Sequence, residues 1–329
     1  MKPFTYIRAS TADQAIAQME VRRESSYLGG GTNLIDLMKM GVEQPSRLVD
    51  VTRLALASIE EWRGGLRIGA MVRNSALAAD PLIRERYPIL SQAVLAGASP
   101  QIRNMATVGG NLLQRTRCNY FYDPSYAECN KRAPGSGCAA LQGYNRNHAI
   151  LGASEHCVAT HPSDMAVALA VLDATVQVKG PRGERSIPFA SFYRLPGDTP
   201  QIETALQPGE LITWIDLPST SMRKSHYLKV RDRNSFAFAL VSVAAVVDID
   251  SSNRIRDARF ALGGVAAHPW RVPEAEVALR GAGLNDERVY RAAADIALRG
   301  AKPLTGNGFK IELARRAISR ACSQAAESA

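Results

Sequence analysis

The sequence predicts an α+β protein in which short strands and helices alternate without a regular repeat. Some segments place apolar residues at helical spacing, and others are short apolar runs typical of strands. Of the 329 residues, 46% are hydrophobic and 22% are charged, as in an ordinary globular chain. The length suggests roughly two to three domains. We therefore expect a multi-domain α+β fold with a sizeable buried core.

The first part of the chain, residues 1–80, is predicted to mix helices with short strands. One expected helix carries Ala15, Ile16 and Met19, and another carries Leu34, Leu37 and Met38. Short strands are expected around residues 27–28, 48–51 and 66–69. A glycine-rich turn, residues 29–33, separates the first of these strands from the second helix.

The second part, residues 81–220, is interrupted by a segment with little apolar patterning, about 115–160. A helix is expected over Met165–Ala174 behind the cap Ser163-Asp164, followed by strands at 176–178 and 211–217. We interpret the interruption as an insertion and residues 1–220 as one domain with subdomains 1–80 and 81–220.

The third part, residues 221–329, is predicted to be a second α+β domain. Strand-like runs occupy 236–247 and 258–262, and helical patterns follow near 285–299 and 309–323. Sheet strands followed by helices at one end are typical of an α+β unit.

Charge and hydropathy exclude several classes of protein. The net charge is +9, but the basic residues are dispersed, which favours a solvated surface or a docking face for acidic partners over nucleic-acid binding. No apolar run approaches the ~20 residues of a membrane span, and the N-terminus lacks a signal-peptide core. The cytoplasm is the default expectation, or the periplasm if a signal-bearing partner carries the folded complex there.

Four of the five cysteines, Cys118, Cys129, Cys138 and Cys157, lie within the interrupted segment among Gly, Pro, Asn and Asp residues. Such a chain can bend to aim four sulfurs at one centre. The spacing fits neither a zinc ribbon nor a bacterial ferredoxin run. A structural zinc, disulfides or unrelated buried cysteines stay open, and an iron–sulfur cluster is favoured. Cys322, near the C-terminus, is expected to be a packing residue.

Two small-residue loops could hold a phosphate group. Residues 29–33 place three glycines between a strand and a helix, where successive backbone N–H groups can face an anion. Residues 107–111 form a second such loop. Neither loop is a G-x-G-x-x-G or Walker motif, and a plain tight turn also explains the first. Together they would suit the pyrophosphate of a dinucleotide, while Asp164 could cap its helix or bind a ribose hydroxyl.

Several motifs, in order along the whole chain, carry a family resemblance. They are Gly29-Gly30-Gly31-Thr32-Asn33-Leu34, Gln101-Ile102-Arg103-Asn104, Thr107-Val108-Gly109-Gly110-Asn111-Leu112, His161-Pro162-Ser163-Asp164, Pro208-Gly209-Glu210-Leu211, Lys229-Val230-Arg231-Asp232-Arg233 and Ala261-Leu262-Gly263-Gly264-Val265-Ala266. With these motifs the sequence resembles the FAD-binding subunit of the xanthine dehydrogenase family of molybdenum hydroxylases. The cysteine segment resembles the branch of bacterial aldehyde oxidoreductases, of the periplasmic type, whose flavin subunit also holds a [4Fe-4S] cluster.

The resemblance implies a fold and a set of cofactor contacts. The fold would be a two-subdomain FAD-binding domain like that of vanillyl-alcohol oxidase, followed by a CO-dehydrogenase-flavoprotein-like domain. Residues Leu28, Gly29, Gly30, Gly31, Thr32, Asn33 and Leu34 would wrap the pyrophosphate of FAD. Thr107, Gly110 and Asn111 would contact the diphosphate or ribityl region, Asp164 a hydroxyl, Leu211 the flavin, and Lys229 the isoalloxazine ring. Cys118, Cys129, Cys138 and Cys157 would ligate the [4Fe-4S] cluster.

The resemblance also implies partners and an activity. A large molybdopterin subunit would oxidise an aldehyde, and a small subunit with two [2Fe-2S] clusters would pass electrons to this chain. The chain would hand the electrons to an external acceptor, as an oxidoreductase subunit of a heterotrimer. A self-sufficient FAD-dependent oxidoreductase is the alternative, but no constellation for its own substrate site is evident. A zinc-stapled scaffold would leave both glycine loops unexplained.

Overall fold

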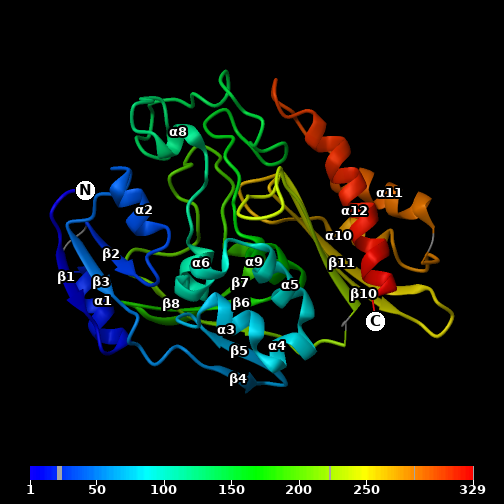
Figure 1. The fold of residues 1–329 in the computed structure, drawn as a ribbon, viewed down its shortest axis with the longest axis horizontal. Helices are drawn as coiled ribbons and strands as arrows, with labels where there is room; N and C mark the ends of the chain where they lie inside the picture. The colour runs from blue at the N-terminus through cyan, green and yellow to red at the C-terminus, as the bar shows by residue number, and fades with distance from the viewer. Residues whose placement is uncertain (21–23, 222–223, 285, 329) are drawn as a thin grey trace.

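The computed structural model describes the chain apart from residues 21–23, 222–223, 285 and 329. Within that part it contains three β-sheets (Figure 1). The α+β class is confirmed. None of the described helices is both long and apolar enough to cross a membrane.

The first sheet is parallel, with the strand order β1-β3-β2. Its elements are β1 (Thr5–Arg8), α1 (Ala12–Glu20), β2 (Ser25–Leu28), α2 (Leu34–Lys39) and β3 (Arg47–Asp50). Neighbouring parallel strands need a crossover connection, and α2 carries the chain from β2 to β3. The glycine turn therefore lies at the carboxyl end of β2, where loops of parallel strands commonly bind ligands. The predicted helices and strands of this region are confirmed, whereas β1 was not predicted.

Asp50, at the end of β3, forms hydrogen bonds with side chains of the neighbouring strand β1. Its carboxylate accepts hydrogen bonds from the Arg8 guanidinium at 3.0 Å, the Thr52 backbone N–H at 2.8 Å and the Tyr6 hydroxyl. Burial alone would raise the pKa of Asp50, but the hydrogen bonds from Thr52, Tyr6 and Arg8 outweigh it and hold the pKa at about 2.

The second sheet is antiparallel, with the strand order β4-β5-β8-β6-β7. Its strands are β4 (Ile59–Trp62), β5 (Gly65–Gly69), β6 (Thr175–Gly180), β7 (Gly183–Pro188) and β8 (Leu211–Leu217). The accompanying helices are α3 (Asn74–Ala79), α4 (Pro81–Arg86), α5 (Pro88–Ala96), α6 (Pro100–Met105), α7 (Val108–Leu112), α9 (Asp164–Val171) and the 3-10 turn η1 (Phe189–Ser191). Helix α9 ends before the predicted Ala174 because Asp173 adopts a left-handed φ of 51°.

The third sheet is antiparallel, with the order β12-β11-β10-β9, and α12 packs along β9 and β10. Its elements are β9 (Lys224–Val230), β10 (Val241–Ile249), β11 (Ile255–Gly263), β12 (Trp270–Arg271), α10 (Pro273–Val277), α11 (Glu287–Ala297) and α12 (Phe309–Glu327). The strand predicted from residue 236 begins only at Val241, since Phe236 has a φ of 50° and residues 236–240 form a loop. The predicted helices are confirmed, apart from position 285, which lies outside the described residues.

Residues 115–160 are mostly loops, with α8 (Asn119–Tyr122) as a short helix. Figure 1 shows this region at the top of the view, between α2 and the beginning of α12. Its contacts reach both neighbours: Lys131 Nζ donates to the Pro200 carbonyl at 2.9 Å, and Asn145 Oδ1 accepts from the Gly306 N–H at 2.8 Å. The cysteine segment is thus attached to both predicted domains.

Candidate functional site

A cavity of about 1120 Å³ lies between the turn after β2, the helices α6, α7 and α9, and strand β9. It gathers residues from distant parts of the sequence. All but one of the side chains and backbone positions predicted for FAD line it, namely Gly29, Gly30, Gly31, Thr32, Asn33, Leu34, Thr107, Gly110, Asn111, Asp164, Leu211 and Lys229. Leu28 is the exception, because it ends β2 and its side chain lies against Gly31.

The backbone of the first glycine loop faces this cavity. The N–H groups of residues 30–33 donate no hydrogen bond to any other residue that the structure describes. Gly31 has a left-handed φ of 73°, which turns the chain between β2 and α2. Successive free N–H groups in such a turn form a concave site for an anion. The loop can therefore receive a phosphate through its backbone alone.

The two glycine loops touch each other. A Cβ atom on Gly30 would stand 1.9 Å from the Met105 carbonyl oxygen, and one on Gly29 would stand 2.9 Å from Thr107 Oγ1. Sequence reasoning explained the three glycines by an anion that faces the backbone N–H groups, or by a plain tight turn. The structure gives a different reason, since the neighbouring backbone at the end of α6 already occupies that space.

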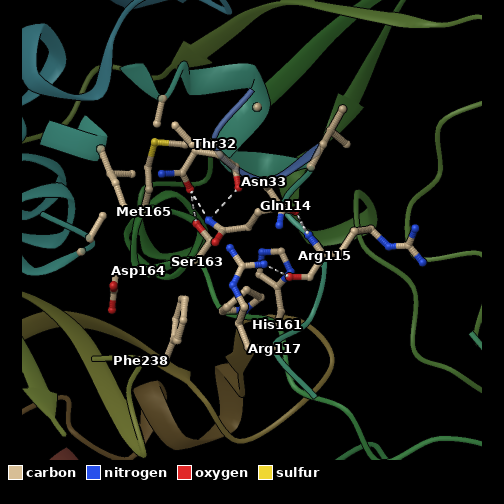
Figure 2. A pocket seen from close by; sticks show the side chains of 18 of the residues that line it. Thr32, Asn33, Gln114, Arg115, Arg117, His161, Ser163, Asp164, Met165 and Phe238 are labelled. Atoms are coloured by element: carbon tan, nitrogen blue, oxygen red, sulfur yellow. Dashed lines mark hydrogen bonds between the residues drawn. The ribbon is translucent and has the colours of Figure 1, made fainter. Parts of the chain in front are cut away.

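Polar side chains fix the second loop against α9. The Thr107 hydroxyl accepts from the Gly110 N–H at 3.2 Å and so caps α7. Asn111 Oδ1 accepts hydrogen bonds from the Ser163 hydroxyl at 2.6 Å and from Gln114 Nε2 at 3.0 Å. Figure 2 shows Ser163, Gln114 and Asn33 pointing toward the same part of the cavity. The ends of the cysteine segment therefore meet at the cavity wall.

Asp164 and Lys229 form a buried ion pair. Their side chains are only 8% and 4% exposed, and Lys229 Nζ lies 2.8 Å from Asp164 Oδ2 and donates to the Ala96 carbonyl at 3.0 Å. The Tyr227 hydroxyl donates to Asp164 Oδ1 at 2.7 Å. Burial, reinforced by the Asp164 charge, raises the pKa of Tyr227 well above its usual value. Asp164 thus positions Lys229 at the cavity, a role that helix capping alone did not suggest; Ser163 is the cap.

Arg117 and His161 are among the cavity residues that sequence reasoning did not assign to the site. The guanidinium carbon of Arg117 lies 5.0 Å from the centre of the Phe238 ring and 5.5 Å from the centre of the Tyr122 ring. Burial lowers the pKa of Arg117. It forms no ion pair with the described acidic residues. Burial lowers the pKa of His161 to about 3, so this ring is neutral. Figure 2 shows Arg117 and His161 next to each other. The basic run before Cys118 was the available signal for Arg117.

The four clustered cysteines are free thiols in one neighbourhood. Cys129 and Cys138 pair as an isolated β-bridge, and Cys118 packs with both of them in two small apolar clusters. Besides burial, Cys157 adds to the raised pKa of Cys118, and Cys138 and Cys129 add to the raised pKa of Cys157. Asn130 Oδ1 shapes the turn between the bridged pair by accepting from the backbone N–H groups of residues 135 and 137, each at 3.0 Å.

Burial raises the pKa of Cys118 to about 12 and that of Cys157 to about 11. Both would therefore stay protonated unless a metal replaced the proton. No group of three or more His, Cys, Asp or Glu in the described chain is arranged to hold a single metal ion. A cubane cluster differs from a single ion because each thiolate binds a different iron, which sets the sulfurs further apart. Cys322 is buried in α12, among the apolar residues of the third sheet.

Comparisons with known families cover nearly the whole chain. Residues 2–220 match the FAD binding domain in molybdopterin dehydrogenase, and residues 226–325 match the CO dehydrogenase flavoprotein C-terminal domain. The chain is similar to solved structures that include the reconstituted CO dehydrogenase from Oligotropha carboxidovorans, with a TM-score of 0.78, 25% identity and all of both chains covered.

Two curated relatives illustrate the range of similarity. The FAD-binding subunit PaoB of an aldehyde oxidoreductase from Escherichia coli strain K12 is 51% identical over 327 residues, 99% of each chain. The medium chain of glyceraldehyde dehydrogenase from Sulfolobus acidocaldarius is 28% identical over 89% of this chain and 86% of its own.

Proposed function

Because the chain belongs to the family of FAD-binding medium subunits of molybdenum hydroxylases, we propose that it is the flavin subunit of an aldehyde-oxidising complex. The similarity to the aldehyde oxidoreductase subunit, 51% over 99% of each chain, carries this proposal. A large molybdopterin subunit would contain the aldehyde site, and a small subunit with two [2Fe-2S] clusters would deliver electrons to this chain. An external acceptor would then remove them.

The cavity supports the predicted FAD contacts. The free N–H groups of residues 30–33 would hold the pyrophosphate, with Thr107, Gly110 and Asn111 on the facing loop. Arg117, a half-buried cation without an ion-pair partner among the described residues, would gain a countercharge from a bound diphosphate. When bound, FAD supplies the redox chemistry, and the protein supplies position and electrostatics.

Lys229 is proposed to lie beside the isoalloxazine ring, with Leu211 packed on it. Two Lys229 hydrogen bonds are already made, to Asp164 and the Ala96 carbonyl, which leaves one N–H of the ammonium for a ligand. The Asp164 carboxylate fixes the direction of that remaining donor. The ion pair would therefore orient Lys229 toward the flavin while reducing its net charge effect.

We further propose that Cys118, Cys129, Cys138 and Cys157 ligate a [4Fe-4S] cluster. The support is the neighbourhood of four free thiols, two of them buried, the Cys129–Cys138 bridge and the two glycines of positive φ in the turn that joins this pair. Lys131, whose charge partly opposes the rise that burial causes in the pKa of Cys157, would offset part of the negative charge of the thiolates. We also propose that residues 1–220 and 221–329 form the two domains.

The test is to purify the chain with its partners and alone, under anaerobic conditions. The complex should contain one FAD and four additional iron atoms assigned to this chain, as judged from flavin and iron analysis and the visible spectrum. The complex should reduce a dye with aldehyde, and the isolated chain should not. Zinc instead of iron would refute the cluster, and aldehyde-dependent dye reduction by the isolated chain would refute the subunit role.

A further inference from the structure

A histidine outside the four cysteines contacts one of their sulfurs. His148 Nε2 lies 3.1 Å from Cys118 Sγ, and the His148 residue is only 5% exposed. The distance is short enough for a hydrogen bond to sulfur. His148 is not needed as a ligand, because four thiolates already satisfy a [4Fe-4S] cluster.

The environment of the ring decides which nitrogen carries its proton. Nδ1 of His148 is buried and has no hydrogen-bond partner among the described residues. An unpaired buried N–H group is rarer and costlier in proteins than an unpaired acceptor. The proton therefore belongs on Nε2, which points it at the Cys118 sulfur.

The backbone of His148 is held from the C-terminal domain. Its carbonyl accepts hydrogen bonds from Lys310 Nζ at 2.9 Å and Asn307 Nδ2 at 3.2 Å, and both of these side chains are fully buried. The His148 N–H donates to the Asn145 carbonyl at 3.0 Å. The ring position is thus fixed by contacts that are independent of the cysteines, as expected of a group that orients toward a metal centre.

We propose that His148 donates an N–H···S hydrogen bond to the Cys118 ligand and raises the reduction potential of the [4Fe-4S] cluster. The inference rests on the proposed cluster. Reduction adds negative charge that is shared with the thiolate sulfurs, and a hydrogen bond to sulfur stabilises that charge. His148 therefore favours the reduced cluster without binding iron.

The test compares His148→Leu, which removes the donor, with His148→Gln, which keeps an N–H donor. His156→Leu is the matched control, since His156 also adjoins a cluster cysteine but its side chain is 41% exposed and lies 3.5 Å from Asp198. Each variant is purified as the full complex, its iron is measured, and the cluster is titrated with EPR detection.

In His148→Leu, the ratio of reduced to oxidised cluster at a fixed potential should fall about tenfold, equivalent to about 59 mV for one electron. His148→Gln should recover most of this change, and His156→Leu should behave like the unmodified protein. If a His148→Leu complex that contains iron keeps the reduction potential of the unmodified complex, the proposed role of His148 is overturned, but the proposed cluster is not. If the unmodified complex contains no [4Fe-4S] cluster, the proposed function is overturned as well.

A second measurement needs no substitution at His148, in case His148→Leu fails to fold. Complex labelled with ¹⁵N-histidine should show a weak ¹⁵N coupling to the reduced cluster in pulsed EPR, and His156→Leu should retain it. A strong coupling would make His148 a ligand, and no coupling would exclude the hydrogen bond; either result overturns the proposal.

Discussion

Replacing Gly30 by alanine should weaken FAD binding, because the new methyl group would force the first glycine loop away from the end of α6, which leads directly into the second glycine loop. The Cβ atom would stand 1.9 Å from the Met105 carbonyl oxygen, 2.7 Å from the Met105 carbonyl carbon and 3.0 Å from Ala106 Cα. All three are backbone atoms, so rotation of a side chain cannot relieve the clash. The loops must separate by roughly 1.5 Å to reach ordinary van der Waals contact.

The free-energy cost of this clash determines how much the FAD dissociation constant rises. Overpacking of a filled site costs about 1–3 kcal/mol, and a contact with backbone belongs at the upper end of that range. The strain relaxes when the loops open, whereas the proposed pyrophosphate site needs both of them in place. Since each 1.4 kcal/mol is a factor of ten, the dissociation constant for FAD should rise about 10- to 100-fold.

The assay is titration of FAD into the flavin-depleted complex, followed by quenching of flavin fluorescence. Gly308→Ala is the matched control, because Gly308 already has a φ of −58° and a Cβ there would meet its nearest atom at 3.9 Å. This control should bind FAD normally and gain about 0.4–1 kcal/mol of stability. A dissociation constant for Gly30→Ala within twofold of the unmodified complex would refute the reasoning.

Three further predictions address the metal site, the buried ion pair and acid stability. Cys129→Ser should remove most of the iron proposed for this chain, and Cys322→Ser should not; iron analysis of both decides, and full iron in Cys129→Ser would contradict the ligand assignment. Asp164→Asn should leave the buried Lys229 charge uncompensated, which lowers the free energy of unfolding by about 3 kcal/mol; an unchanged urea midpoint would contradict this. The lowered pKa of Asp50, about 2, implies a stabilisation that is present above pH 4 and is lost as the pH falls toward 2. This stabilisation amounts to about 2 kcal/mol. In Asp50→Asn the urea midpoint should therefore change less between pH 4 and pH 2 than it does in the unmodified protein.

Local patterns in the sequence predicted much of the fold. Strand β8 was predicted over the residues that it occupies, 211–217, and α2 was predicted behind the glycine turn. Helix periodicity, caps and glycine turns depend on residues close in sequence, so they are visible without the tertiary structure. The start of β10 was wrong by five residues because its apolar run continues back to Phe236, where a positive φ breaks the strand.

The sequence by itself therefore determined the α+β class, the family resemblance, the two glycine loops and the cysteine segment. Only the tertiary structure decided which of these residues act on each other. It set Gly30 against the Met105 carbonyl, paired Asp164 with Lys229, placed Arg117 in the cavity and brought His148 to Cys118. The physical reason is that a residue's own backbone preference is local, whereas the atom that faces its side chain comes from a distant segment and depends on how the whole chain packs.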